Sequence, residues 1–210
     1  MNFKKDKFLV IKKAISRDLS IFIYNYICLK KQIYQTMREA NYISPFTKDF
    51  GNFGDGQVPK TYSYYSDTAM ETLLIKLQEK VEKYTKLKLV PNYSYTRLYE
   101  KGDELRRHID RFSCEISATL FLGGDQWPIY AEPTGKTGMK GKKINLNVGD
   151  MLIYRGRDLE HWREPFTGDT CAQVFLHYND VNTKEADLNI FDTRKHIGLP
   201  LFFKSGVNRW

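Results

Sequence analysis

Cysteine is scarce in this 210-residue sequence, and the signatures of several protein classes are missing. The three cysteines, Cys28, Cys114 and Cys171, are odd in number and form no closely spaced pair, which argues against a disulfide framework or a thiolate metal site. No uninterrupted apolar run approaches the length of a membrane span, and the first residues lack the apolar core of a signal peptide. We therefore expect a protein with no membrane partner and a cytoplasmic location, in a microbial cell or in host cytoplasm if the gene is viral.

Positive charge exceeds negative charge but is not concentrated in any long run. The formal net charge is +8, and 28% of the residues are charged while 41% are hydrophobic, which is typical of a folded globular protein. Lys and Arg are scattered, so a solvated face accounts for them, and no Arg-rich or aromatic–basic stripe of a nucleic-acid module is present. A nucleic-acid partner stays open but is not favoured.

The first part of the chain has the periodicity of two amphipathic helices. Residues 8–11 form a short β-type run, and Ser16 is a candidate N-cap for a helix that continues to about Ala40. A Gly-, Asn- and Asp-rich loop is expected over residues 41–66, where it is either a lid over an active site or a plain connection. A second helix begins at Thr68, which with Glu71 has the spacing of a capping box.

After Pro91 the pattern changes to short β-type runs separated by glycine turns. Helices followed by many closely spaced strands, with no βαβ repeat, predict an α+β, mainly β fold: a β-sandwich or jelly roll buttressed by N-terminal helices. We expect one domain over 1–210, with helical support to about 90, a barrel core over 91–180 and a C-terminal extension over 181–210. The expected core strands are Tyr93–Tyr99, Ile116–Leu122, Trp127–Ala131, Ile144–Val148, Met151–Tyr154 and Ala172–Tyr178.

Histidine is rare, and two of the four histidines stand out as metal ligands. His108 and Asp110 are two residues apart, so on a strand their side chains share a face. A second imidazole, from His161, would complete a two-histidine, one-carboxylate triad with open positions opposite, which suits non-heme iron(II). The His-x-Asp pair alone is weak, because such pairs often occur by chance in cores and on surfaces.

The surrounding motifs strengthen this interpretation. The segment from Tyr99 through Gly102 to His108 and Asp110 is followed by the alternating run 116–122, by the tight turn Gly149-Asp150, and by His161-Trp-Arg leading into 173–178. Together, residues 93–178 resemble the core of the 2-oxoglutarate and Fe(II)-dependent oxygenases, with the prolyl 4-hydroxylase-like branch the most similar.

This resemblance implies a double-stranded β-helix, cupin-like in form, with His108, Asp110 and His161 as the iron ligands. It implies 2-oxoglutarate and O2 as co-substrates, with ascorbate compatible as an auxiliary reductant, and a hydroxylated C–H bond with succinate and CO2 as by-products. The first substrate class it suggests is a protein or peptide side chain, with proline foremost. A free amino acid or small metabolite, a nucleic-acid base, or a non-catalytic β-barrel module that keeps a metal site remain as alternatives.

One departure from the family pattern concerns the basic residue that holds the distal carboxylate of 2-oxoglutarate. The family often places it in the strand after the distal histidine, but Thr170, Cys171 and Ala172 are not cationic. Burying a dianion without a cation is costly, so we expect Arg163, two residues after His161, to replace it. Alternatives are a surface ion pair for Arg163, with Arg111, Arg97 or His177 as the anchor. Tyr99 and Thr119 are expected to line the co-substrate pocket, although the many tyrosines near Tyr99 could simply belong to the core and ordinary packing explains Phe121, which alternates with Thr119 along the same strand, equally well.

Overall fold

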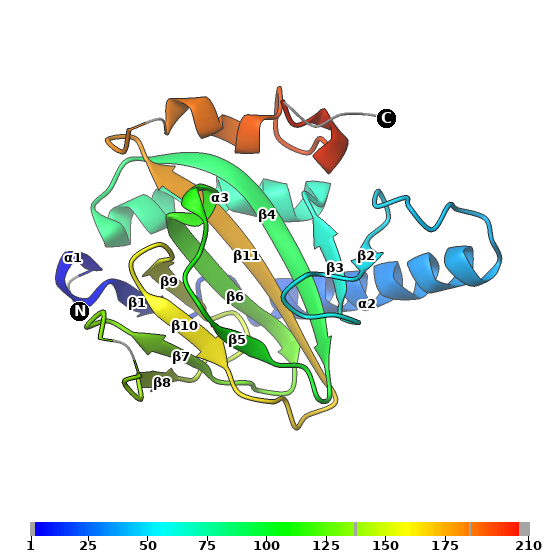
Figure 1. Ribbon diagram of the computed structural model, residues 1–210, viewed down its shortest axis with the longest axis horizontal. Coiled ribbons are helices and arrows are strands. Elements are labelled where there is room, and N and C mark those ends of the chain that lie inside the picture. The colour runs from blue at the N-terminus through cyan, green and yellow to red at the C-terminus, as the bar shows by residue number, and fades with distance from the viewer. Residues whose placement is uncertain (1–2, 137, 185, 206–210) are drawn as a thin grey trace.

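Two antiparallel β-sheets build the protein, which a computed structural model describes over residues 3–136, 138–184 and 186–205 (Figure 1). The larger sheet has the strand order β1-β9-β6-β11-β4-β3-β2, and the smaller sheet has the order β5-β10-β7-β8. The strands of the larger sheet are β1 (Phe8–Ile11), β2 (Asn52–Phe53), β3 (Tyr62–Tyr65), β4 (Leu89–Glu100), β6 (Ile116–Gly124), β9 (Met151–Arg155) and β11 (Thr170–Asp180). Those of the smaller sheet are β5 (Leu105–His108), β7 (Ile129–Glu132), β8 (Lys142–Ile144) and β10 (Glu160–Arg163).

Period-two alternation along the central strands sends side chains into two separate cores. On β6, Ala118 and Leu120 pack toward the helices, in a cluster with residues of α2 and α3. Phe121, on the opposite face, belongs to a second cluster that also holds Leu105 and Ile129 of the smaller sheet, so this cluster lies between the two sheets. The predicted double-stranded β-helix is therefore confirmed.

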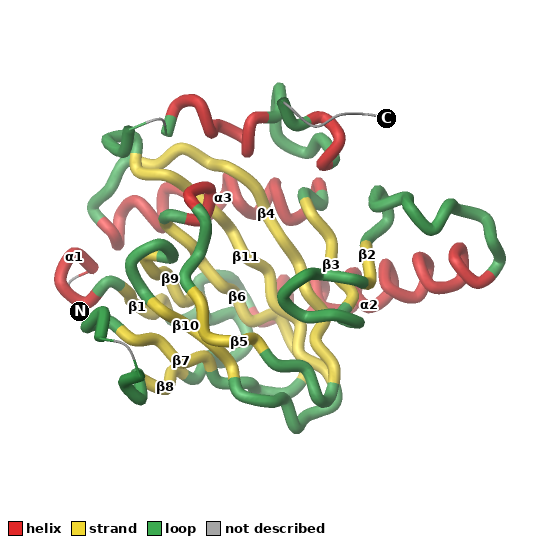
Figure 2. The backbone as a smooth tube through the Cα atoms, in the orientation of Figure 1, coloured by secondary structure: helices red, strands yellow, loops and turns green. Residues whose placement is uncertain are grey.

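Two long helices cover the outer face of the larger sheet (Figure 2). Helix α2 (Arg17–Glu39) begins at the predicted cap, since the Ser16 hydroxyl accepts a hydrogen bond from the Leu19 N–H at 3.2 Å. Helix α3 (Thr68–Thr85) is capped by Asp67, whose carboxylate accepts from two backbone N–H groups of the first turn. The predicted Thr68 capping box is wrong, because the Glu71 carboxylate pairs instead with the buried Arg194 guanidinium at 2.8 Å.

Several boundaries differ from those predicted. The strand expected over 144–148 is β8, Lys142–Ile144, and β4 begins at Leu89, before Pro91. The expected loop over 41–66 contains β2 and β3, and β3 pairs with β4 through four residues (Tyr62 with Leu98 to Tyr65 with Tyr95). The run Tyr-Ser-Tyr-Tyr has no strict apolar alternation, so it gives little strand signal until a partner strand supplies the hydrogen bonds.

The ends of the described chain lie on the outside of the sheets (Figure 1). At the N-terminal end, helix α1 (Phe3–Asp6) precedes β1. At the C-terminal end, the 3₁₀ segments η2 (Asp187–Thr193) and η3 (Leu201–Phe203) follow β11. A further 3₁₀ turn, η1 (Phe112–Cys114), lies within the chain between β5 and β6. Among the described residues, no helix combines the length and apolar character needed to cross a bilayer.

Candidate active site

His108, Asp110 and His161 come together at the edge of the smaller sheet. His108 ends β5 and lies directly opposite His161 on β10, and their ring centroids are 4.2 Å apart. Asp110 follows β5 in a loop, where its N–H donates to the Gly156 carbonyl at 2.8 Å. One ligand atom from each of the three side chains lies within 4.8 Å of the other two, so they can hold a single cation. The prediction that the three groups converge is confirmed, although Asp110 lies beyond the strand.

The two imidazoles are oriented by backbone carbonyls. Nδ1 of His108 is 2.7 Å from the Arg106 carbonyl oxygen, and Nδ1 of His161 is 3.1 Å from that of Leu159. A neutral imidazole that donates from Nδ1 keeps its lone pair on Nε2. Both Nε2 atoms lie 3.5 Å from Oδ1 of Asp110, so two lone pairs and a carboxylate face one another. This donor set fits a divalent transition metal such as iron(II).

Asp110 is held as a carboxylate by its surroundings. Burial opposes its ionisation, but when no metal is bound and the Nε2 atoms of His161 and His108 carry protons, their charge and hydrogen bonds outweigh burial and hold the pKa of Asp110 far below its ordinary value. Its Oδ2 accepts a hydrogen bond from the Ser117 hydroxyl at 3.0 Å. Gly156 leaves the room for this carboxylate, since a Cβ there would lie 2.4 Å from Oδ2. Ser117 and Gly156 were not singled out in the sequence, although Ser117 is the first polar residue of the alternating β6 run.

A cavity of about 360 Å³ opens beside the triad. Its wall combines the three residues of the triad with two cationic side chains, Arg97 and Arg111. The other side chains on the wall are mostly aromatic, and they include Tyr93, Tyr95, Tyr154 and Phe175. A mostly apolar pocket with a few convergent polar groups is the usual form of a small-molecule site.

Arg163 lies deep in the core rather than at the surface. Its side chain is 1% exposed, and Nη1 donates to the Trp127 carbonyl. Nε and Nη2 are buried and have no hydrogen-bond partner in the described structure. Trp162, between His161 and Arg163, faces outward and stacks on Tyr130, so the two flanking side chains are on the buried side as predicted. A buried guanidinium with two unpartnered nitrogens lacks the anion that such a group requires.

The other basic candidates already have partners. Arg97 makes a two-point contact with Asp55, at 3.0 Å from Nε and 2.7 Å from Nη2. Arg111 is half exposed and contacts Asp192 at 3.3 Å. Nδ1 of His177 is 3.0 Å from the Ser117 hydroxyl, and His177 does not belong to the group of residues that could share a metal.

Tyr99 and Thr119 are fully buried in the space between the sheets and do not line the 360 Å³ cavity. The Tyr99 phenol accepts from Arg97 Nη1 at 3.2 Å, and the Thr119 hydroxyl donates to Gln173 at 3.0 Å. These contacts extend a polar layer through the barrel interior, into which Arg163 also projects. Gln173 was missed in the sequence, although it alternates with Cys171 and Phe175 on β11.

Part of the loop over 41–66 covers the cavity. The Asp55 carboxylate accepts from Arg97, from the Tyr95 hydroxyl at 2.6 Å and from the Gln57 N–H at 2.8 Å. Gln57 itself lines the cavity, and Val58 is buried in the core between the sheets. The segment near residue 55 curls in front of the sheet, whereas residues just after α2 extend away from it (Figure 1). No local pattern in the sequence identifies Asp55, because its partners lie on β4.

Replacing Asp55 with Asn should destabilise the fold by about 3–5 kcal/mol, because it leaves the buried Arg97 charge unpaired. Burial opposes ionisation of Asp55 but Arg97 outweighs it and lowers the Asp55 pKa, so this stabilisation is present at neutral pH and is lost on acidification through the folded pKa. Urea unfolding at pH 7 measures the effect, with the exposed Asp49→Asn as the matched control. Equal stability of the two variants would show that the pair contributes little.

Protonation of His177 should make the fold sensitive to acid. Burial lowers the pKa of His177 from its ordinary 6.5 to about 4. Between these two pH values His177 is protonated in the unfolded chain but neutral in the folded chain. The free energy of unfolding therefore falls by roughly 3 kcal/mol as the pH drops from about 6.5 to about 4. His177→Asn should flatten this dependence in urea titrations at pH 7, 6 and 5. An unchanged slope would mean that His177 accepts a proton in the folded state.

Solved structures of 2-oxoglutarate-dependent enzymes share this fold. A Pseudomonas putida prolyl-4-hydroxylase aligns with a TM-score of 0.58 and 14% identity over 85% of this chain and 95% of that chain. SnoN, a non-heme α-ketoglutarate-dependent epimerase from nogalamycin biosynthesis, aligns with a TM-score of 0.62 and 12% identity over 85% and 80%. HygX from Streptomyces hygroscopicus, solved with nickel, 2-oxoglutarate and hygromycin B, gives 0.55 and 13% over 87% and 86%.

These neighbours agree with the resemblance found in the sequence, and the prolyl hydroxylase is among them. No protein-family model and no curated protein matches the sequence significantly. At such low identity the likeness establishes the fold, and one fold carries hydroxylation and epimerisation alike. The chemistry has to be argued from the site itself.

Proposed function

We propose that this chain, which has the fold of the 2-oxoglutarate-dependent oxygenases, is an Fe(II)- and 2-oxoglutarate-dependent dioxygenase that hydroxylates a substrate C–H bond. The observation that carries the proposal is that one strand, β10, contributes to a group of side chains that could hold a metal ion and also carries a buried guanidinium with two unpartnered nitrogens. His161 contributes to a cation site, and Arg163, two residues later, is a buried cation without an anion. A metal chelated by a dicarboxylate would satisfy both.

In this proposal His108, Asp110 and His161 hold the iron. The carbonyl oxygens of residues 106 and 159 fix the imidazole tautomers, and Ser117 orients the carboxylate through its hydroxyl. When bound, the iron and 2-oxoglutarate supply the chemistry that converts O2 and 2-oxoglutarate into CO2 and succinate while a C–H bond is hydroxylated. The protein contributes position and the exclusion of water.

Arg163 holds the distal carboxylate of 2-oxoglutarate in this assignment. Its unpartnered Nε and Nη2 provide the two-point fork that matches a carboxylate. In this assignment the co-substrate extends from the triad past the cavity wall into the polar layer between the sheets, where the Tyr99 and Thr119 hydroxyl groups would be further contacts. Arg97 is less suited, because Asp55 already neutralises it.

The substrate proposed first is a protein or peptide prolyl side chain, which the likeness to prolyl hydroxylases supports. The second candidate is a small molecule, supported by the modest size of the cavity beside the triad. A nucleic-acid base is not favoured, since the described cavity wall carries only two cationic side chains and one of them is neutralised by Asp55.

Conversion of 2-oxoglutarate to succinate tests the proposal. The iron-loaded wild-type protein should release succinate in the presence of O2, slowly without substrate and faster with an accepted peptide or metabolite. His108→Ala should abolish this turnover, whereas the matched control His196→Ala, at an exposed histidine, should retain it. If the wild-type protein neither binds nor consumes 2-oxoglutarate, the chain is a non-catalytic module and the proposal fails.

A further inference from the structure

Arg111 brings a second, separate positive charge to the cavity. It follows the ligand residue Asp110 directly, lines the same cavity, and its side chain is 53% exposed. Its guanidinium lies 5.0 Å from the centre of the Tyr93 ring, which supports it from one side. The charge is therefore held at the mouth of the cavity, beside the metal triad and apart from the deeply buried Arg163.

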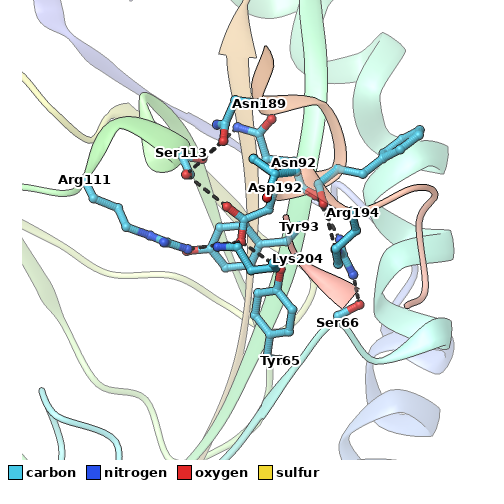
Figure 3. A network of polar contacts seen from close by, with 12 residues as sticks. Tyr65, Ser66, Asn92, Tyr93, Arg111, Ser113, Asn189, Asp192, Arg194 and Lys204 are labelled. Carbon is cyan, nitrogen blue, oxygen red and sulfur yellow. Dashed lines mark hydrogen bonds and ion pairs between the residues drawn. The ribbon is translucent and has the colours of Figure 1, made fainter. Parts of the chain in front are cut away.

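Asp192, in the C-terminal segment, forms an ion pair with Arg111 (Figure 3). This carboxylate is buried, and its Oδ2 lies 2.7 Å from the Tyr65 hydroxyl, 2.8 Å from Lys204 Nζ and 3.3 Å from Arg111 Nη2. Three donors share one oxygen, and the contact with Arg111 is the longest of them. Since Lys204 already compensates Asp192, the Arg111 guanidinium can turn toward a ligand without leaving an unpaired buried charge.

The backbone that carries Asp192 adopts an unusual conformation. Phe191, Asp192 and Thr193 all have positive φ, at 55°, 56° and 66°, in a region that residues other than glycine seldom occupy. The next residue, Arg194, anchors the segment through its buried ion pair with Glu71 at 2.8 Å. Backbone strain that is held in place by buried contacts often marks a functional position.

The formal charges around the cavity do not balance on the side that faces the substrate. In the loaded site, a divalent metal, the Asp110 carboxylate, dianionic 2-oxoglutarate and the Arg163 guanidinium sum to zero. Arg97 and Asp55 cancel each other. Arg111 and Lys204 share the single carboxylate of Asp192, which leaves one uncompensated positive charge on the substrate side.

We propose that Arg111 binds a carboxylate of the substrate, so that the substrate is an organic acid whose carbon skeleton packs on the aromatic wall of the cavity. The carboxylate is either the free acid group of a small molecule or an acidic side chain next to the oxidised residue of a peptide. This inference rests on the proposed function, because it assigns the substrate side of the same site. A two-point fork between guanidinium and carboxylate supplies both affinity and orientation.

Paired probes that differ only in the carboxylate test the inference. The protein, loaded with Zn(II) and 2-oxoglutarate so that turnover does not occur, is titrated with N-acetyl-L-proline or its primary amide, and with acetyl-Pro-Asp-amide or acetyl-Pro-Asn-amide. Binding is followed by the side-chain Nε–H resonance of Arg111 in NMR spectra, identified from its loss in Arg111→Gln. We expect the acids to shift this resonance and the amides to leave it in place, and the tighter-binding acid identifies the source of the carboxylate.

Variants of Arg111 measure how much this side chain contributes to the affinity for the acid probes. Arg111→Gln should weaken binding of the acid probe about ten- to hundredfold, as the loss of a charge-assisted contact predicts, and Arg111→Lys should weaken it less. Arg157→Gln is the matched control, because Arg157 is exposed, packs on Phe112 and does not line the cavity. Equal binding of acids and amides, or unchanged affinity in Arg111→Gln, would overturn the inference.

Succinate formation by the wild-type protein separates this inference from the function on which it rests. Succinate release together with no preference for the acid probes would leave the oxygenase intact and overturn the Arg111 site. An acid-specific shift of the Arg111 resonance without any consumption of 2-oxoglutarate would instead support the anion site and contradict the oxygenase.

Discussion

Arg163→Met is expected to weaken 2-oxoglutarate binding by about two to three orders of magnitude. A buried charged contact that loses one partner typically costs about 2–5 kcal/mol, and each 1.4 kcal/mol is tenfold in affinity. Methionine fills a similar volume but cannot pair with a carboxylate. Calorimetric titration of the metal-loaded protein with 2-oxoglutarate measures the change directly.

The same substitution should make the ligand-free protein more stable. Arg163 is 1% exposed with two unpartnered nitrogens, so its removal relieves a buried, uncompensated charge. A rise in Tm without ligand, together with loss of the Tm increase that 2-oxoglutarate induces, would therefore identify the anchor. The exposed Arg157→Met serves as the control for both measurements. Retained affinity would assign the distal carboxylate to another residue.

Asp110→Asn is expected to lower metal affinity by at least about a hundredfold, and turnover with it. The substitution keeps the shape of the side chain but removes the negative charge that faces both imidazoles at 3.5 Å, which is the charge of the proposed metal ligand. Residues that only orient a metal ligand contribute about 10–100-fold, so loss of the ligand itself should exceed that range. Titration with Co(II), followed by its visible absorption, measures affinity without relying on activity.

Ser117→Ala is the graded comparison for this prediction. Ser117 donates to Asp110 but is not a ligand itself, so its removal should fall within the 10–100-fold range of a supporting residue. If Asp110→Asn bound Co(II) as tightly as Ser117→Ala, the carboxylate would not be a ligand and the metal centre would have to be sought elsewhere.

The sequence predicted the general architecture well because strand alternation and helical periodicity are local properties. Ala118 and Leu120 on one face of β6, with Phe121 on the other, follow directly from the period of a strand. The Ser16 cap was also predictable, since its contact spans only three residues. The Thr68 capping box was wrong because Glu71 finds a stronger partner in Arg194, more than a hundred residues away.

The supporting contacts of the candidate site could not be predicted in the same way. Asp55 reaches Arg97 from a loop, and Asp192 reaches Arg111 from the C-terminal segment. These charges pair across distant parts of the chain, and no periodicity or spacing relates them. The lack of a partner for two Arg163 nitrogens likewise depends on the surrounding fold. The position of Arg163, two residues after His161, does not predict it.

The sequence alone determined the mainly β fold and the two long helices, because these depend on residue types at short, regular intervals. It also identified the three metal-ligand candidates, because the order of the motifs around them resembles that of a known enzyme family. Tertiary structure alone decided that His108 lies opposite His161, that Asp55 neutralises Arg97, and that Arg163 remains without an anion. The physical reason is that burial and pairing set the energy of a charge, and both depend on which distant strands and loops the fold brings together.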